Sequence, residues 1–433
     1  MPRPGHFIAL CVVALLCIGA VMVQSASMTT GEKPPAPLPA PTMEAGSPSE
    51  FASSPVSEAP LGSEGVVTFK SIVLSRQVAY MTLAIIAMIA ASRLPVLSLL
   101  NPRRLGPPPE RTRLSVPTPL IAATLALLFG LALVYVPGVG REVNGSARWV
   151  QIPVAGSLQP SEIAKWALPI LLGLYAAWQT SARMRSFRAL IPALAITGIL
   201  TAFIIKEDLG TGVLMLGVAA VVLVAAGARI WHFALFVPPA MAALAFAALS
   251  SDYRRQRLEA FLDPWADPEG AGYHMIQSML AVANGQGFGR GLGFGLQKFG
   301  YLPEDHSDFL FAVICEELGI AGAATVIALY LAILAAGTTI VRNAPTMATR
   351  LIALGVLATL GGQAVINLGV VTGLGPTKGI ALPLLSSGGT GWILTAFSLG
   401  LLIALDRESH AGTYASSEAP MLRLTTDSSS MAA

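Results

Sequence analysis

Long apolar runs are the feature that most restricts what this chain can fold into. A helix needs about 20 apolar residues to cross a bilayer core, and lipid offers an unpaired backbone group no hydrogen-bond partner. Runs that approach or exceed this length are too long for the strands of a membrane barrel. They occur about ten times, at 7–24, 77–92, 117–136, 162–179, 189–205, 209–228, 231–250, 309–340, 351–372 and 390–405. The sequence therefore predicts an all-α, polytopic membrane protein with about ten transmembrane helices.

The composition agrees with this class and excludes an ordinary soluble protein. Of the 433 residues, 54% are hydrophobic and only 12% are charged, whereas about 25% of the residues in a typical soluble domain are charged. The net charge of +3 gives no indication of nucleic-acid binding. The three cysteines all lie in apolar runs, so they provide neither a disulfide framework nor the spacing of a metal site.

Arginine placement orients the predicted helices. Arginines cluster in 93–113 and 183–188 and recur at Arg229 and Arg342, in connections that alternate along the chain. Because the cytoplasmic loops of membrane proteins carry an excess of Lys and Arg, we expect these connections in the cytoplasm. Both termini are then cytoplasmic as well, and the long segment 251–308 lies outside.

The first span allows two interpretations. Arg3, an apolar run and "SAS" at 25–27 also fit a cleavable signal peptide, but we favour a retained helix. The predicted organisation is a first transmembrane helix (1–29), a disordered Pro/Ser-rich extracytoplasmic loop (30–70), helices 2–7 (71–250), a large extracytoplasmic catalytic loop (251–308), helices 8–10 (309–405) and a disordered cytoplasmic tail (406–433).

The long outer segment contains a glycine cluster, "GQGFGRGLGFGLQKFG" at 285–300. No strand precedes it, and it lies on the wrong side of the membrane for cytosolic nucleotides, so it is not a nucleotide-binding fingerprint. A tightly folded loop whose backbone approaches a ligand is one interpretation. Its amides, with Arg290 and Lys298, would suit a diphosphate. The alternative is a flexible re-entrant loop whose cations lie at the level of the lipid head groups.

Acidic residues stand at the start of the next apolar run. Asp308 directly precedes that run, and desolvation there would raise its pKa and make it a stronger base. Alternatively, Ser307 or Asp308 is a helix N-cap, and the two roles are compatible. His306 is either a ligand or an interfacial residue. Glu316 and Glu317 lie about two turns further on, where buried acids are expected to face the bundle interior and pair with a cation.

More charged residues mark the outer ends of other predicted spans. They are Arg148, Glu162, Lys165, Asp208 and Lys378. Glu162 and Lys165 are three residues apart on one helix face, which also fits a simple local ion pair. Together, acids and cations around one end of an apolar bundle suit a substrate with an anionic head and a lipid tail.

Several of these stretches, in this order, resemble the SEDS family (shape, elongation, division and sporulation proteins). The most specific are "QPSEIAK" at 159–165, "DLGTG" at 208–212, "LPEDHSDFLFAVICEELG" at 302–319 and "INLGVVTGLGPTKGIALPLLSSGG" at 366–389. Within the family, "DPWAD", "QKFGYLPE" and "PTKG" are more similar to the division branch than to the elongation branch. The chain departs from the family pattern at Glu207, where Pro is usual, at Ser387, where Tyr is usual, and in its lengthened first outer loop.

The resemblance implies ten transmembrane helices and a peptidoglycan glycosyltransferase of the bacterial inner membrane that polymerises lipid II at the outer leaflet during cell division. It places the family's essential acid on Asp308, its Glu and Lys of the fourth span on Glu162 and Lys165, and its acid before the sixth span on Asp208. It also implies a class B penicillin-binding transpeptidase, other division proteins and membrane lipid as partners, and no nucleic acid.

The combined hypothesis is an inverting transfer in which Asp308 takes the proton of an acceptor hydroxyl. Arg148, Arg290, Lys298 and Lys378 would stabilise the departing diphosphate, and His306 would contact the substrate. The sequence requires no cofactor and leaves open whether a divalent cation, Mg²⁺ or Mn²⁺, takes part. A lipid-precursor flippase or transporter and a non-catalytic scaffold for division proteins are the alternatives.

Overall fold

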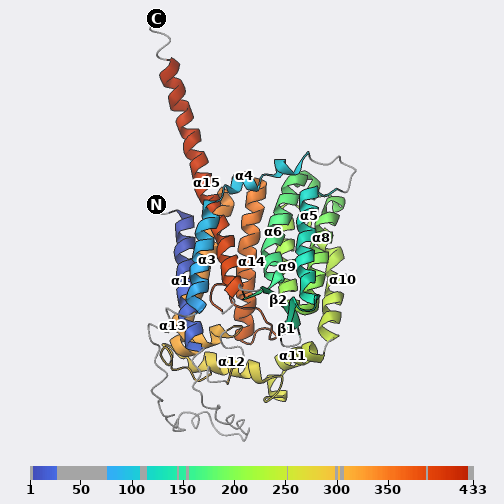
Figure 1. Ribbon diagram of the computed structural model, residues 1–433, viewed down its shortest axis with the longest axis vertical. Coiled ribbons are helices and arrows are strands. Elements are labelled where there is room, and N and C mark those ends of the chain that lie inside the picture. The colour runs from blue at the N-terminus through green and yellow to red at the C-terminus, as the bar shows by residue number, and fades with distance from the viewer. Residues whose placement is uncertain are drawn as a thin grey trace.

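The computed structural model describes residues 3–26, 76–107, 115–143, 146–152, 156–250, 252–297, 301–302, 307–386 and 389–427. Within these residues the chain forms a helical bundle that runs between two ends (Figure 1). Its long helices are α1 (Pro4–Ala26), α3 (Arg76–Arg93), α5 (Thr118–Ala132), α6 (Pro160–Gln179), α8 (Phe187–Glu207), α9 (Leu209–Ala225), α10 (Ile230–Leu249), α13 (Leu310–Asn343), α14 (Met347–Val371) and α15 (Gly389–Asp427). Each predicted span falls on one of them.

Shorter elements close the two ends of the bundle. They are α4 (Val96–Leu99), η2 (Pro102–Leu105), η3 (Leu133–Tyr135), α7 (Ser181–Met184), α11 (Asp252–Leu262), η4 (Pro264–Ala266) and α12 (Tyr273–Asn284), with three strands, β1 (Gly140–Val143), β2 (Ser146–Ile152) and β3 (Gly156–Leu158). Helices α11 and α12 cross the end of the bundle opposite to the one where both chain ends lie (Figure 1).

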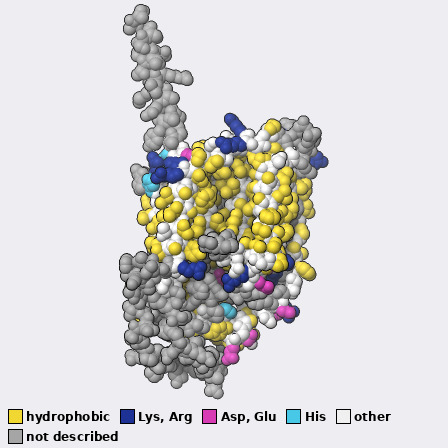
Figure 2. Space-filling view, in the orientation of Figure 1, with side chains coloured by type: hydrophobic (Ala, Val, Ile, Leu, Met, Phe, Trp, Pro, Cys, Tyr) yellow, Lys and Arg dark blue, Asp and Glu magenta, His cyan; other side chains and the backbone are white. Residues whose placement is uncertain are grey.

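The surface has the pattern of a multi-pass membrane protein. Figure 2 shows an apolar band across the visible face of the bundle, with charged side chains gathered above and below it. Large apolar side chains of the bundle helices are exposed, among them Trp231 (81%) and Phe246 (75%) of α10. Such exposure is unfavourable in water and favourable in lipid.

The number of membrane crossings stays a prediction. By length and apolar composition, six helices among the described residues qualify as spans, or seven if the bent pair formed by α3 and the α4–η2 segment counts as one. Helix α9 is only 17 residues long. Helix α6 carries Glu162 and Lys165 in its first two turns. Helices α6 and α9 therefore do not qualify, and neither does α10, of which only Val237–Phe246 is a continuous apolar stretch among the described residues.

Two apolar cores hold the bundle together. One packs α1, α3, α13, α14 and α15, and the other packs α5, α6, α8 and α9. Small residues permit the closest crossings, as expected for helices in lipid. A Cβ at Gly400 of α15 would lie 2.5 Å from the backbone oxygen of Met88 in α3. Any larger residue at position 400 would therefore separate these two helices.

The chain ends meet at one end of the bundle. The backbone N–H of Gly5 donates to Asp406 Oδ2 at 3.1 Å, and Arg407 Nη1 donates to the carbonyl of Ser92 at 2.7 Å. Helix α15 continues to Asp427, beyond the helix end predicted at 405, and the disorder predicted for the tail stays a prediction. Residues 406–408 are polar because they bind neighbouring helices, and not because the helix has ended. The predicted disordered loop, 30–70, lies outside the described residues.

Helix α13 is broken near its start. Gly319 has φ 65° and ψ −161°, a conformation that is essentially restricted to glycine. A Cβ at this position would lie 2.3 Å from the backbone nitrogen of Gly289. The sequence predicted one continuous span here. The break lets the glycine-rich loop pack directly against the α13 backbone.

We predict that Gly319→Ala destabilises the protein strongly. The backbone strain alone should cost about 1–3 kcal/mol, and the new methyl group would displace the glycine-rich loop. Thermal unfolding in detergent measures this loss. Gly217→Ala in α9, where a Cβ meets nothing within 4 Å, is the matched control and should unfold at or above the wild-type temperature. Equal unfolding temperatures for the two variants would contradict the assignment.

Candidate active site

A small antiparallel sheet, in the order β1-β2-β3, joins α5 to α6. It was not foreseen in the sequence, where only helices and loops were expected. The short run "ARWVQI" at 147–152, rich in β-branched and aromatic residues and close to glycines on both sides, carried the signal. The sheet matters for the site because β2 carries Arg148 to the junction of α8 and α9.

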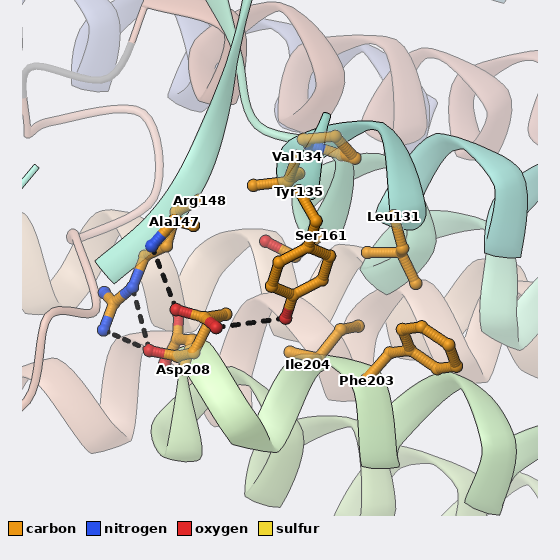
Figure 3. A pocket seen from close by; sticks show the side chains of 11 residues that line it. Leu131, Val134, Tyr135, Ala147, Arg148, Ser161, Phe203, Ile204 and Asp208 are labelled. Carbon is orange, nitrogen blue, oxygen red and sulfur yellow. Dashed lines mark hydrogen bonds between the residues drawn. The ribbon is translucent and has the colours of Figure 1, made fainter. Parts of the chain in front are cut away.

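Glu207 fixes the sheet to this junction. Arg148 donates from Nε at 2.9 Å and from Nη2 at 2.5 Å to the backbone oxygen of Glu207. The Glu207 carboxylate accepts from the backbone N–H of Ala147 at 3.0 Å and from the Tyr135 hydroxyl at 3.0 Å (Figure 3). The departure from the family pattern at Glu207 therefore has a structural role, which sequence reasoning missed.

Asp208 caps the next helix. Its Oδ1 accepts from the backbone N–H of Thr211 at 3.0 Å, and its Oδ2 accepts from the Thr211 hydroxyl at 2.7 Å. Asp208 is buried. With Arg148, Tyr135 and Ser161 it lines a small open cleft at the end of α8 (Figure 3).

The segment 378–379, between α14 and α15, brings the predicted site residues together. A Cβ at Gly379 would lie 3.1 Å from Arg148 Nη1 and 3.5 Å from Asp308 Oδ2. Burial lowers the pKa of Lys378, and the nearby negative charge of Asp208 opposes this shift. The structure thus gathers Arg148, Asp208, Asp308 and Lys378 around one short segment, although they are far apart in the sequence.

Asp308 lies in the turn that leads into α13 and is partly buried. Phe309 occupies the N-cap position without a side-chain cap, so the predicted N-cap at Ser307 or Asp308 is wrong. The backbone oxygen of Asp308 accepts a hydrogen bond from Asn367 Nδ2 at 2.8 Å, and the same nitrogen donates to the oxygen of Ile380 at 2.8 Å. Asn367 was not singled out from the sequence.

Glu162 and Lys165 form the local ion pair that was one of the two interpretations of their spacing. Lys165 Nζ lies 2.6 Å from Glu162 Oε1, and the lysine is 2% exposed. The same Nζ donates to Gln363 Oε1 at 2.7 Å, while Gln363 Nε2 donates to the carbonyl of Ala381 at 2.8 Å. The pair is therefore connected through α14 to the segment that carries Lys378.

Glu316 and Glu317 bind the glycine-rich loop through its backbone. The Glu316 carboxylate accepts from the N–H groups of Leu296 at 2.9 Å and Gln297 at 3.1 Å. The Glu317 carboxylate accepts from Gly293 at 3.0 Å. It also accepts from the Ser25 hydroxyl of α1, at 3.0 Å on Oε1 and 2.8 Å on Oε2. We call this arrangement, Glu316 and Glu317 with loop residues 290–297 and Ser25, the carboxylate clasp.

The clasp corrects one interpretation of the glycine cluster. The backbone N–H groups at 290 and 291 donate to the carbonyls of Glu316 and Glu317, each at 2.9 Å, and those at 293, 296 and 297 donate to the two carboxylates. These amides bind the protein and not a diphosphate. Both acids are fully buried, as predicted. Their main partners, however, are amides, and Arg290 Nε is 4.0 Å from Glu316 Oε1.

Two predicted site residues, Lys298 and His306, lie outside the described residues. Among the residues that the structure describes, no three His, Cys, Asp or Glu side chains come close enough to hold a metal ion.

Comparisons with known proteins identify the family. A family model described as "Cell cycle protein" (FTSW_RODA_SPOVE) matches residues 61–411. The chain belongs to this family. Its relatives include "Probable peptidoglycan glycosyltransferase FtsW" of Geobacter metallireducens, 41% identical over 281 residues, which cover 64% of this chain and 74% of the relative. "Stage V sporulation protein E" of Bacillus subtilis is 41% identical over 285 residues, which cover 65% and 77%.

Solved structures share the fold. A chain from "Structural coordination of polymerization and crosslinking by a peptidoglycan synthase complex" matches with a TM-score of 0.61 and 26% identity, covering 93% of this chain and 97% of that one. The rod shape determining protein RodA of Thermus thermophilus matches with a TM-score of 0.52 and 24% identity, covering 93% and 96%. The expected SEDS fold is confirmed, and with it the activity class, a membrane glycosyltransferase of cell-wall synthesis.

We predict that Glu317→Gln loosens the clasp. An amide of the same shape would turn its NH₂ group toward donors, and hydrogen bonds to a charged acceptor each contribute about 1.5–3 kcal/mol. Hydrogen exchange of the amides at 291–297 should accelerate by roughly 10- to 100-fold. Glu259→Gln, on the exposed face of α11, is the control and should leave that exchange unchanged. Full protection in Glu317→Gln would show that the carboxylate does not hold the loop.

Proposed function

We propose that this protein polymerises lipid II, a disaccharide-peptide linked through diphosphate to a polyprenyl tail, with Asp308 as the catalytic base. The observation that carries the proposal is that Asp308 and Arg148 both lie beside Gly379. A carboxylate oxygen of Asp308 and a guanidinium nitrogen of Arg148 both lie within 3.5 Å of one point beside this glycine. A base and a cation beside the same short segment are what a glycosyl transfer with an anionic leaving group requires.

The reaction follows from these groups. Asp308 accepts the proton of the acceptor sugar's 4-hydroxyl while that oxygen forms a bond to the anomeric carbon of the donor. The bond from this carbon to the diphosphate oxygen breaks, and the electron pair leaves with polyprenyl diphosphate. The anomeric configuration inverts. The proton remains on Asp308 until water removes it. Diphosphate is a good leaving group, so no general acid is needed, unlike in most glycosidases.

Cations at the same end of the bundle would stabilise the leaving diphosphate. Arg148 and Lys378 are the two whose positions support this role, because they flank Gly379 and Asp208. Charge that develops in a partly dry site is stabilised more strongly than in water. Arg290 is close to Glu316 and would contribute less than the sequence suggested. Roles for Lys298 and His306 remain part of the proposal on sequence grounds.

In the inferred orientation, the end of the bundle that carries Asp308 and Gly379 lies outside the cell. The opposite end carries Arg93, Arg104 and Arg407 near the chain termini, and arginine-rich ends face the cytoplasm. Lipid II carried on the outer leaflet would then reach the base from the bilayer. Because glycan strands must also be crosslinked, we propose a class B penicillin-binding transpeptidase as partner. The relative in the peptidoglycan synthase complex supports this choice.

A role in cell division is also proposed, since relatives named FtsW are 41% identical. A flippase, the main alternative, would need polar groups along the membrane path. The charged residues of the predicted site, such as Arg148, Asp208 and Asp308, lie instead at one end of the bundle. Purified protein with lipid II in detergent distinguishes these cases, because a polymerase makes glycan strands without a membrane and a flippase does not.

We predict that Asp308→Asn lowers glycan polymerisation by about 10²- to 10⁴-fold, the usual contribution of a positioned base. Polymer formed from lipid II by the purified variant is measured on gels, with unfolding temperature as a check on folding. Asp252→Asn, an exposed acid of α11, is the matched control and should polymerise normally. Near-normal product from Asp308→Asn would refute the base assignment.

The lowered pKa of Lys378 predicts an alkaline loss of substrate binding. A lysine with a lowered pKa loses its charge at a lower pH than an ordinary lysine, so affinity for a diphosphate should fall as pH rises through that pKa. Asp208→Asn removes the charge that raises the pKa, and the fall should then begin at lower pH. Lys378→Arg stays charged and should abolish this alkaline fall. Binding that is independent of pH in the wild type, up to the ordinary lysine range, would exclude the role.

A further inference from the structure

Two amide side chains of α14 stand between the separate parts of the site. Gln363 and Asn367 are four residues apart, so they share one helix face. Gln363 connects Lys165 to the carbonyl of Ala381. Asn367 connects the backbone of Asp308 to the carbonyl of Ile380. The helix therefore holds the 378–381 segment against the ion pair of α6 with one amide and against the proposed base with the other.

The orientation of the Asn367 amide is fixed by its partners. Both partners are carbonyl oxygens, which only accept hydrogen bonds, so the NH₂ group must face them. Reversing the amide would bring its oxygen against two acceptors. Asn367 consequently ties the main chain of residue 308 to residue 380, next to Gly379 and its contacts with Arg148 and Asp308 Oδ2.

The oxygen of the Asn367 side chain, Oδ1, indicates that this residue does more than stabilise the fold. Asn367 is 2% exposed, and its Oδ1 has no hydrogen-bond partner among the described residues. An unpaired buried acceptor costs free energy. Gln363, one turn earlier, uses both ends of its amide. A buried Asn at this position therefore costs stability. We attribute its presence to the hydrogen bond from Nδ2 that positions the backbone of Asp308.

We propose that Asn367 is a positioning residue for the transfer reaction, which sets the Asp308 carboxylate relative to the cations beside Gly379. It acts on the backbone of Asp308 and does not contact the saccharide. A shift of about 1 Å in a reacting group can lower a rate by about 10²-fold. The inference rests on the proposed role of Asp308, and the experiment separates the two.

The test compares Asn367→Leu with the wild type in a lipid II polymerisation assay. Leucine has the same branched arrangement and the same number of side-chain heavy atoms, although it is bulkier, and it donates no hydrogen bond. The expected result is a kcat that is about 10- to 100-fold lower, with KM within about twofold, because the substrate's own contacts remain. Asn367→Gln, which keeps the amide but lengthens the side chain, should fall between the two. It also provides the same comparison if the leucine variant does not fold.

The matched control is Thr359→Val. Thr359 is also buried in α14, and its hydroxyl donates to the carbonyl of Gly355 at 2.8 Å, two turns away from Asn367. This variant should keep the wild-type kcat. If it loses as much as Asn367→Leu, a general weakening of α14 explains both effects and the proposal is overturned.

A double variant that combines Asn367→Leu with Asp308→Asn shows whether Asn367 acts by positioning the base or has an independent effect on the rate. If Asn367 acts through Asp308, the double variant is no slower than Asp308→Asn alone. A further loss equal to that of Asn367→Leu in the wild type would overturn the proposal, as would an unchanged kcat in both position-367 variants. Normal activity of Asp308→Asn by itself would instead refute the proposed base, whatever the result at position 367.

Discussion

The candidate site depends on how the chain satisfies backbone groups where its helices are interrupted. In lipid, an unpaired N–H or carbonyl has no water to bind, so a glycine-rich loop and a broken helix at the membrane boundary need internal partners. The carboxylate clasp supplies them. Two fully buried acids, Glu316 and Glu317, accept the N–H groups of the loop. These bonds hold the loop against the first turns of α13, directly after Asp308.

The clasp also connects distant parts of the chain. Ser25, near the end of α1, donates to Glu317, so the first helix is fixed to the same two turns of α13 that follow Asp308. Charged groups buried near lipid are costly and usually mark functional sites. Here the acids are structural, and they serve the function indirectly by holding the segment that carries the base.

A second set of contacts assembles the site around residues 378–381. The amides of Gln363 and Asn367 reach this segment from α14, and Arg148 reaches it from the small sheet. The sheet is in turn held by Glu207. Each contact joins a side chain to a backbone atom or to a neighbouring charge. The arrangement can therefore support a base and cations at one end of a bundle whose remaining surface is apolar.

The sequence by itself determined the membrane class, the helical architecture, the family and the placement of Glu162 and Lys165 on one helix face. These features depend on local hydrophobicity and on spacing within one helix, which are readable along the chain. The tertiary structure alone decided that the glycine-rich amides bind Glu316 and Glu317, that Glu207 anchors a sheet, and that Asn367 reaches Asp308. Those partners are far apart in the sequence, and no local pattern specifies which buried donor meets which acceptor.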